Sequence, residues 1–137
     1  MWKYYALLSA IFAALTAILS KLGVKGVNGN IATAIRTTVV LFLAWGIVLF
    51  TTELKSFKEL SKQNLYFLIA SGLATGLSWI FYFKALETGE VSKVAPIDKL
   101  SIVFVMIISF IFLKEPMDLK TILGGTLIFA GALVLIL

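Results

Sequence analysis

Residues 31–51 read IATAIRTTVVLFLAWGIVLFT, an apolar stretch that carries a single charge, Arg36. An α-helix rises about 1.5 Å per residue, so about 20 apolar residues cover the roughly 30 Å hydrocarbon core of a bilayer. Four further stretches are of similar length and character: residues 2–20, 65–83, 94–113 and 121–137. We therefore predict an all-α integral membrane protein with five transmembrane helices.

The composition agrees with a membrane protein and argues against several other classes. Hydrophobic residues make up 61% of the 137 residues and charged residues 14%, whereas a soluble domain is about half apolar and about a quarter charged. The net charge of +5 comes mainly from lysines between the apolar stretches. Such lysines are typical of membrane loops, so nucleic-acid binding is not expected.

The chain contains no Cys and no His. Thiolate and imidazole metal sites, disulfides and Cys nucleophiles are therefore excluded. Proton transfer near neutral pH would have to use a carboxylate.

Short polar segments connect the apolar stretches. Residues 21–30 (KLGVKGVNGN) predict a turn because they carry three Gly and two Asn. Residues 84–93 predict a tight connection around Gly89, and Pro116 is expected to end the fourth helix. No segment is long enough for a soluble domain, so residues 1–137 are expected to form one five-helix unit.

The connection at residues 52–64 is the longest and the most charged. It predicts either a short interfacial helix, with Phe57 and Leu60 toward the lipid, or a solvated loop.

The distribution of basic residues gives almost no orientation signal. If the five spans alternate, one side carries Lys3, Lys55, Lys58, Lys62, Lys114 and Lys120, and the other carries Lys21, Lys25, Arg36, Lys84, Lys93 and Lys99. Arg36 and Lys99 lie inside apolar stretches. If these two residues are left out of the count, the positive-inside rule slightly favours a cytoplasmic N-terminus. Two interpretations stay open: a single topology set by the longest basic connection, or insertion in both orientations.

The third stretch carries hydroxyl groups on one helical face. Ser71, Thr75, Ser78 and Tyr82 are spaced by four, three and four residues, which places them on one side of a helix. A glycine pair and the aromatic Trp79 run beside that face. The face either lines a solute cavity or packs against another helix, with its hydroxyls bonded to backbone carbonyls.

Three charges lie inside apolar stretches: Arg36 in the second, and Asp98 and Lys99 in the fourth. A charge at mid-bilayer costs about 2.5–3.5 kcal/mol on insertion scales, so it needs a partner, water or a route to the surface. Arg36 and Lys99 are long enough to extend toward the headgroups. Asp98 is shorter and follows Pro96, which lacks an N–H group. We predict an ion pair of Asp98 with Arg36 or with a lysine, near a cavity mouth; the carboxylate could instead exchange a proton.

Residues 82–137 carry the motifs of a known family. They read YFKALETGEVSKVAPIDKLSIVFVMIISFIFLKEPMDLKTILGGTLIFAGALVLIL. The aromatic-plus-small helix end at 82–86, the VAP triplet at 94–96, the Leu-x-Glu step at 113–115 and the glycines of the last helix resemble the EamA-like branch of the drug/metabolite transporter superfamily. The resemblance covers the whole chain, and the string PIDKLS at 96–101 is similar to the half-size, single-unit type.

The resemblance implies a fold of ten helices around a central cavity, in two halves inverted relative to each other. Such an inverted repeat suits alternating access to a site near the midplane. A chain with one five-helix unit would then need a second copy in the opposite orientation, so a homodimer is expected; a parallel dimer stays open. The first helix has no acidic residue, which argues against the small-multidrug-resistance branch.

We predict a secondary transporter that moves a small metabolite across a prokaryotic cytoplasmic membrane, with proton coupling as an option. No enzymatic activity and no cofactor are expected, because the chain offers no nucleophile–base or metal constellation. The expected partners are the lipid bilayer, a small solute and a second copy. The predicted solute cavity is lined by Arg36, Ser71, Thr75, Ser78, Trp79, Tyr82, Asp98, Lys99 and Ser101. The rival hypotheses are a non-transporting subunit that packs against a larger membrane partner, and a channel.

Overall fold

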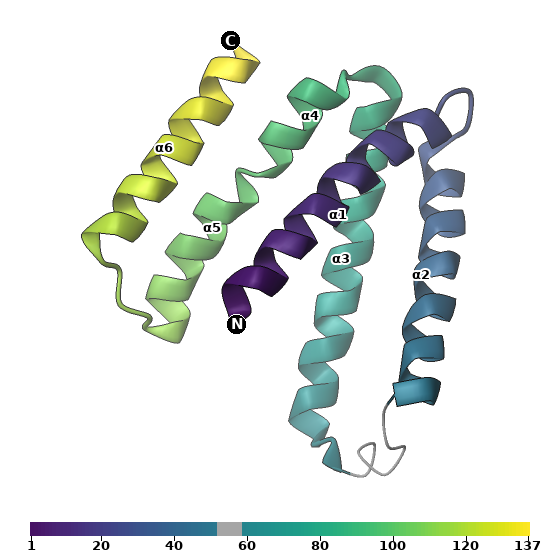
Figure 1. Cartoon of the computed structure of the whole chain (residues 1–137), viewed down its shortest axis with the longest axis horizontal. Helices are drawn as coiled ribbons and strands as arrows, with labels where there is room; N and C mark the ends of the chain where they lie inside the picture. Colours follow the sequence, from purple (N-terminus) through teal and green to yellow (C-terminus); the bar gives the residue numbers. More distant parts are fainter. Residues whose placement is uncertain (52–58) are drawn as a thin grey trace. The chain divides into compact units, whose positions relative to one another are not determined.

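The computed structural model describes residues 1–51 and 59–137 as helices joined by short connections (Figure 1). The helices are α1 (Trp2–Gly23), α2 (Gly29–Thr51), α3 (Lys62–Thr88), α4 (Val91–Asp98), α5 (Ser101–Ile108), the π-helical turn η2 (Ser109–Leu113) and α6 (Leu119–Ile136). Five segments are long and apolar enough to cross a membrane, and α4, α5 and η2 together make one of them, Val91–Leu113. The predicted five membrane-spanning helices are confirmed.

The predicted end of the third span is wrong. α3 continues to Thr88, so only Gly89 and Glu90 connect it to α4, and the expected connection at residues 84–93 is too long. Residues 84–88 (KALET) contain no Gly or Pro, and Lys, Ala, Leu and Glu are good helix formers. The helix therefore runs on until Gly89.

The connection before α3 is described only in part. Residues 52–58, and with them the predicted lipid-facing Phe57, lie outside the described residues, whereas Leu60 and Ser61 are not helical. The Ser61 hydroxyl accepts the N–H of Asn64 at 3.1 Å. This bond satisfies one of the free N–H groups at the start of α3.

The fourth span is interrupted between α4 and α5. The N–H of Lys99 is shared between the carbonyls of Ala95 (3.3 Å) and Pro96 (3.1 Å), and the N–H of Leu100 bonds to Ile97 (3.0 Å). Bonds that reach back three residues are tighter than those of an α-helix. Pro96 has no N–H to donate within α4. The α-helix stops at Asp98 and resumes at Ser101, and the tightened turn between them follows Pro96.

The fourth span ends at Leu113, before Pro116, as the proline predicted. Lys114 adopts the left-handed conformation with φ 53°. This turn lets the Ser109 hydroxyl donate to the Glu115 carboxylate, which joins the last helical turn to the connection that follows.

The contacts between helices divide the chain into two compact units: residues 1–17 with 89–137, and residues 18–88. In the first unit α6 packs against α4 and α5. In the second unit α2 and α3 pack side by side as an antiparallel hairpin (Figure 1).

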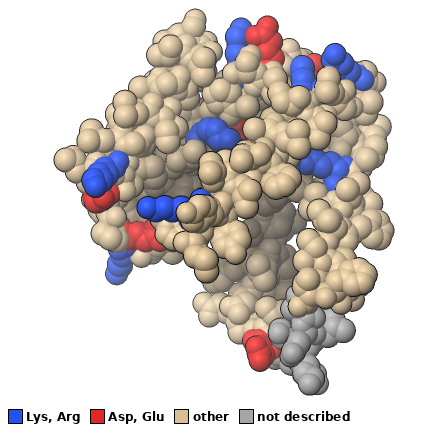
Figure 2. Space-filling view, in the orientation of Figure 1, with Lys and Arg blue, Asp and Glu red and all other residues tan. Residues whose placement is uncertain are grey.

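Very few residues are buried in either unit. In the unit of residues 18–88 they gather where α1 ends, α2 begins and α3 ends: Ser20, Val24, Gly29, Thr33, Phe83 and Leu86. The remaining helix surfaces expose large apolar side chains, and uncharged residues cover most of the face shown in Figure 2. Apolar exposure of this extent is not tolerated in water. These apolar surfaces are therefore expected to be covered by lipid or by other membrane-spanning helices.

The start of α6 provides a pH-dependent test of this fold. Asp118 is the N-cap of α6, and its carboxylate accepts the N–H of Thr121 at 2.9 Å and the Thr121 hydroxyl. These bonds hold the pKa of Asp118 below its ordinary value. The unfolded pKa of an Asp is about 3.9. The charged cap therefore stabilises the fold fully above that pH, and its contribution is lost as the pH falls through the lowered folded pKa.

We predict that detergent-solubilised wild-type protein has a higher Tm than Asp118→Asn at neutral pH, because only Asp118 is charged at the positive helix end. Asn is an equally good N-cap, so the Tm difference should shrink toward zero as the pH falls below the unfolded pKa and through the lowered folded pKa of Asp118. A difference that stays constant over this range would contradict the assignment.

Candidate solute-binding site

Two hydrogen bonds fasten the helix ends in the unit of residues 18–88. The Glu87 carboxylate, near the end of α3, accepts the N–H of Gly29, the first residue of α2. The ammonium group of Lys21 donates to the carbonyl of Leu86 at 2.6 Å. A carboxylate at a helix N-terminus satisfies a free N–H group and is favoured by the helix dipole. The start of α2 is thereby held against the end of α3.

One face of α2 extends from these hydrogen bonds toward the middle of the span. Gly29, Thr33 and Arg36 are spaced by four and three residues, so they share a side of the helix. The buried Thr33 hydroxyl donates to the carbonyl of Gly29 at 2.7 Å, which satisfies it within the helix. Arg36 is the first charged residue on this face.

The guanidinium of Arg36 lies over two aromatic rings of α3. Its Cζ is 4.3 Å from the ring centroid of Trp79 and 5.6 Å from that of Phe83. Both distances are within the range of a cation–π interaction. Tyr82 packs edge-on against Phe83, with centroids 6.4 Å apart and an interplanar angle of 88°. We call Arg36, Trp79, Phe83 and Tyr82 the arginine–aromatic cluster.

The arginine–aromatic cluster lies well inside the helix pair. Arg36 is seven residues after the start of α2, which is about 10 Å along the helix axis. The ring nearer to its guanidinium is that of Trp79, which is farther from the end of α3 than Phe83. Arg36 therefore has partners at its own depth, in contrast to a side chain that extends to the membrane surface.

Within the described residues of this unit, 18–51 and 59–88, no carboxylate forms an ion pair with Arg36. Asp98 belongs to the other unit, where its Oδ2 lies 3.4 Å from Nζ of Lys99. Both side chains are partly exposed at the interruption of the fourth span, and Ser101 begins the helix that follows. The pairing of Arg36 with Asp98 stays a prediction.

The hydroxyl face of α3 is only partly engaged. The Thr75 hydroxyl donates to the carbonyl of Ser71 at 2.8 Å, which is the bond expected of a packing residue. Ser71, Thr75 and Ser78 are exposed, and Tyr82 is half-buried. The structure thus brings Arg36, Trp79 and Tyr82 of the predicted set into one cluster, and places the hydroxyl residues along α3. Their contact with a solute stays a prediction.

Phe83 and Glu87 were not among the predicted site residues. A signal for them exists in the sequence, because Trp79, Phe83 and Glu87 follow one another at intervals of four residues and so share a helix face. Glu87 was missed because residues 84–93 were interpreted as a connection, which cut that face short.

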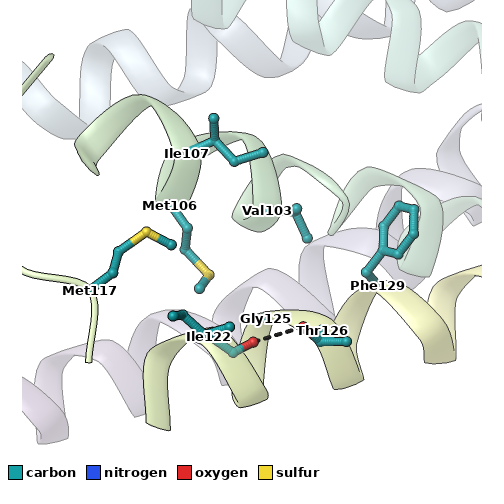
Figure 3. Close-up of a pocket in the computed structure, with 8 residues that line it drawn as sticks. All are labelled: Val103, Met106, Ile107, Met117, Ile122, Gly125, Thr126 and Phe129. Atoms are coloured by element: carbon teal, nitrogen blue, oxygen red, sulfur yellow. Dashed lines mark hydrogen bonds between the residues drawn. The ribbon is translucent and has the colours of Figure 1, made fainter. Parts of the chain in front are cut away.

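A small cavity of about 180 Å³ lies between α5, α6 and the connection that precedes α6 (Figure 3). It is lined by Val103, Met106, Ile107, Met117, Ile122, Gly125, Thr126 and Phe129. The Thr126 hydroxyl, its one polar side-chain group, already donates to the carbonyl of Ile122 at 2.9 Å. A solute site needs a few polar groups that fix orientation. The arginine–aromatic cluster supplies such a group, and this cavity does not.

No group of three or more His, Cys, Asp or Glu side chains that could hold a metal ion occurs in the part of the chain that the structure describes.

The five spans define a multi-pass α-helical membrane protein, and comparison with known proteins gives its family. The sequence model of the EamA-like transporter family matches residues 1–137. A protein of Sinorhizobium sp., described as an "Uncharacterized transporter in cobO 3'region", is 48% identical over 134 residues, which are 98% of this chain and 95% of that protein. No solved structure matches the chain significantly.

The chain belongs to the EamA-like transporter family, so the resemblance predicted from its motifs is confirmed. It is a membrane transporter of several spans, and the relative is bacterial.

Two glycine variants test how closely the start of α2 packs against the end of α3. A Cβ at Gly29 would lie 2.7 Å from Oε1 of Glu87 and 3.3 Å from the backbone N of Lys84, whereas a Cβ at Gly23 would meet nothing within 4 Å. We predict that Gly29→Ala destabilises the protein by about 1–3 kcal/mol, the usual cost of overpacking. Gly23→Ala should leave stability nearly unchanged. Equal denaturation midpoints for the two variants in detergent would contradict this packing.

Proposed function

We propose that the chain is a secondary transporter that moves a small metabolite by alternating access, as a dimer of two copies. The observation that carries this proposal is the interruption of the fourth span at Lys99 and Leu100, next to the carboxylate of Asp98. There the backbone tightens to hydrogen bonds that reach back three residues, which is a departure from the α-helix at membrane depth. Transporters use such interrupted helices to build solute and ion sites.

The position of Asp98 supports a role in coupling. It lies seven residues after the start of α4, about 10 Å along the span. A carboxylate at that depth is costly unless it is paired or functional. Its contact with Lys99 is between neighbouring side chains, both partly exposed, so water or a solute can reach the pair. Protonation of Asp98 would release Lys99, and this exchange would couple solute movement to a proton gradient.

We propose that two groups of residues contact the solute, one in each unit. In the unit of residues 18–88 these are Arg36, Ser71, Thr75, Ser78, Trp79 and Tyr82, and in the other unit they are Asp98, Lys99 and Ser101. Hydroxyl groups would recognise the polar part of the solute, and aromatic rings its apolar part.

The number of spans supports the proposed dimer. Five spans place the two chain ends on opposite sides of the membrane. The ten-helix, inverted-repeat arrangement that the family resemblance implies then needs a second copy in the opposite orientation. The near-equal count of basic residues on the two sides is compatible with such dual insertion.

Proteoliposomes with an internal pH-sensitive dye test the function. We predict saturable proton movement when members of an amino-acid and organic-acid panel are added to wild-type protein. Asp98→Asn should abolish it without affecting membrane insertion. Glu90→Gln is the matched control, because Glu90 also contacts a lysine, Lys93 at 3.3 Å, but is well exposed at the start of α4; it should retain wild-type flux.

Three outcomes would contradict the proposal in different ways. Wild-type flux in Asp98→Asn would exclude the coupling role of Asp98. Flux that neither saturates nor shows counterflow would identify a channel. A folded protein that moves no member of the panel would favour the non-transporting subunit.

Topology tests the proposed dimer. The chain has no Cys, so Val27→Cys and Ser61→Cys each introduce a single thiol, at opposite ends of α2, without changing a charge. We predict that an impermeant thiol reagent labels part of each variant in intact cells. Complete labelling of one variant and none of the other would show a single orientation and exclude an inverted homodimer.

A further inference from the structure

We infer that the solute is an organic anion whose carboxylate is recognised by Arg36 within the arginine–aromatic cluster. The inference rests on the proposed transport function and adds the chemical class of the solute to it. The structure supports it through the geometry of Arg36, the charges around it and its depth in the span.

The cation–π contacts of Arg36 leave its hydrogen-bond donors available. A guanidinium carries five N–H donors in one plane, and a cation–π contact offers them no hydrogen-bond acceptor of the usual kind. Within residues 18–51 and 59–88 Arg36 forms no hydrogen bond or ion pair to a side-chain or backbone acceptor. A planar fork of N–H donors matches a carboxylate, which accepts two parallel hydrogen bonds.

The charges near the arginine–aromatic cluster favour an anion. Residues 18–36 and 79–88 contain four basic residues, Lys21, Lys25, Arg36 and Lys84, and a single acidic residue, Glu87. The Glu87 carboxylate is already bonded to the N–H of Gly29. The excess of positive charge attracts anions and repels cationic solutes.

The depth of Arg36 gives the anion an energetic role. A charge held about 10 Å from the start of a membrane-spanning helix is costly, and two aromatic rings offset that cost only in part. A bound carboxylate would complete the pairing of Arg36. The rings of Trp79 and Phe83 would at the same time provide apolar surface for the rest of the solute. A small carboxylate with a flat apolar group satisfies both features.

The test compares three probes of nearly equal shape and different charge: benzoate, benzamide and benzylamine. Their binding to purified, detergent-solubilised full-length protein is measured by titration calorimetry at constant ionic strength. We predict saturable binding of benzoate at up to millimolar concentrations, and at least about tenfold weaker binding of the neutral amide, because a charged hydrogen-bond pair is lost. Benzylamine should not bind.

Variants connect the selectivity to Arg36. Arg36→Gln should raise the Kd of benzoate by about tenfold or more, and Arg36→Lys should raise it less, since Lys keeps the charge but loses the fork. Lys62→Gln is the matched control: it also removes one positive charge from this unit, at an exposed side chain at the opposite end of α3 from the arginine–aromatic cluster. It should leave the Kd within about twofold of wild type.

The inference is overturned if wild-type protein binds no benzoate, if it binds the amide or the amine equally well, or if Arg36→Gln keeps the wild-type Kd. An equal loss in Lys62→Gln would also overturn it, because the loss of benzoate binding would then come from the total charge of the unit and not from Arg36. If neither Arg36 variant folds, as judged by size-exclusion chromatography, the inference is tested by the wild-type protein alone, through its preference for benzoate over benzamide and benzylamine.

Counterflow of radiolabelled benzoate in proteoliposomes separates this inference from the proposed function. Binding that depends on Arg36, without counterflow, would refute transport and leave the recognition of carboxylates standing. Saturable counterflow of the amino-acid panel, with no preference for carboxylate over amide in the probe set, would refute the inference and leave transport standing.

Discussion

The interaction between the Arg36 guanidinium and the rings of Trp79 and Phe83 is the constraint on which the unit of residues 18–88 depends. A fixed positive charge inside a membrane-spanning helix must be held by something other than lipid. The rings that hold it lie on α3, so α2 and α3 have to remain paired at that depth. The fastening of Gly29 to Glu87 and of Lys21 to Leu86 keeps the two helix ends together just beyond it.

The solvent around the helices explains the rest of the architecture. In lipid, apolar side chains gain nothing by being buried, so helices pair through close contacts of small residues and a few polar bonds. Gly125 on α6 is such a contact, since a Cβ there would lie 2.6 Å from Cε of Met106. The backbone must also bond internally, and the fourth span departs from the α-helix in two places, at the tightened turn after Pro96 and at the π-helical turn η2. The interruption after Pro96 exposes Asp98 and Lys99 within a span.

Sequence reasoning predicted the spans because their length and apolar content are set by the bilayer, and the motifs around residues 82–137 predicted the family. The sequence-based boundary at the end of α3 is wrong, because the charges of residues 84–93 are typical of a connection, whereas KALET continues the helix to Thr88. The sequence shows that Arg36 needs a partner, but it does not identify that partner. Helical spacing shows which residues share a face of α2, and it does not show which residues of another helix cover that face. Trp79 and Phe83 cover Arg36 only because α2 and α3 are antiparallel and in this register.

The most direct test uses the fact that Arg36 is the sole arginine of the chain, so a two-dimensional NMR spectrum contains a single Nε–Hε signal of an arginine. If the guanidinium lies over Trp79 at 4.3 Å, the ring current shifts this signal upfield in detergent micelles. The shift should disappear in Trp79→Leu and persist in Trp45→Leu, a matched change of a tryptophan on α2. An arginine signal at its ordinary frequency, or one that does not respond to the loss of Trp79, would contradict the account.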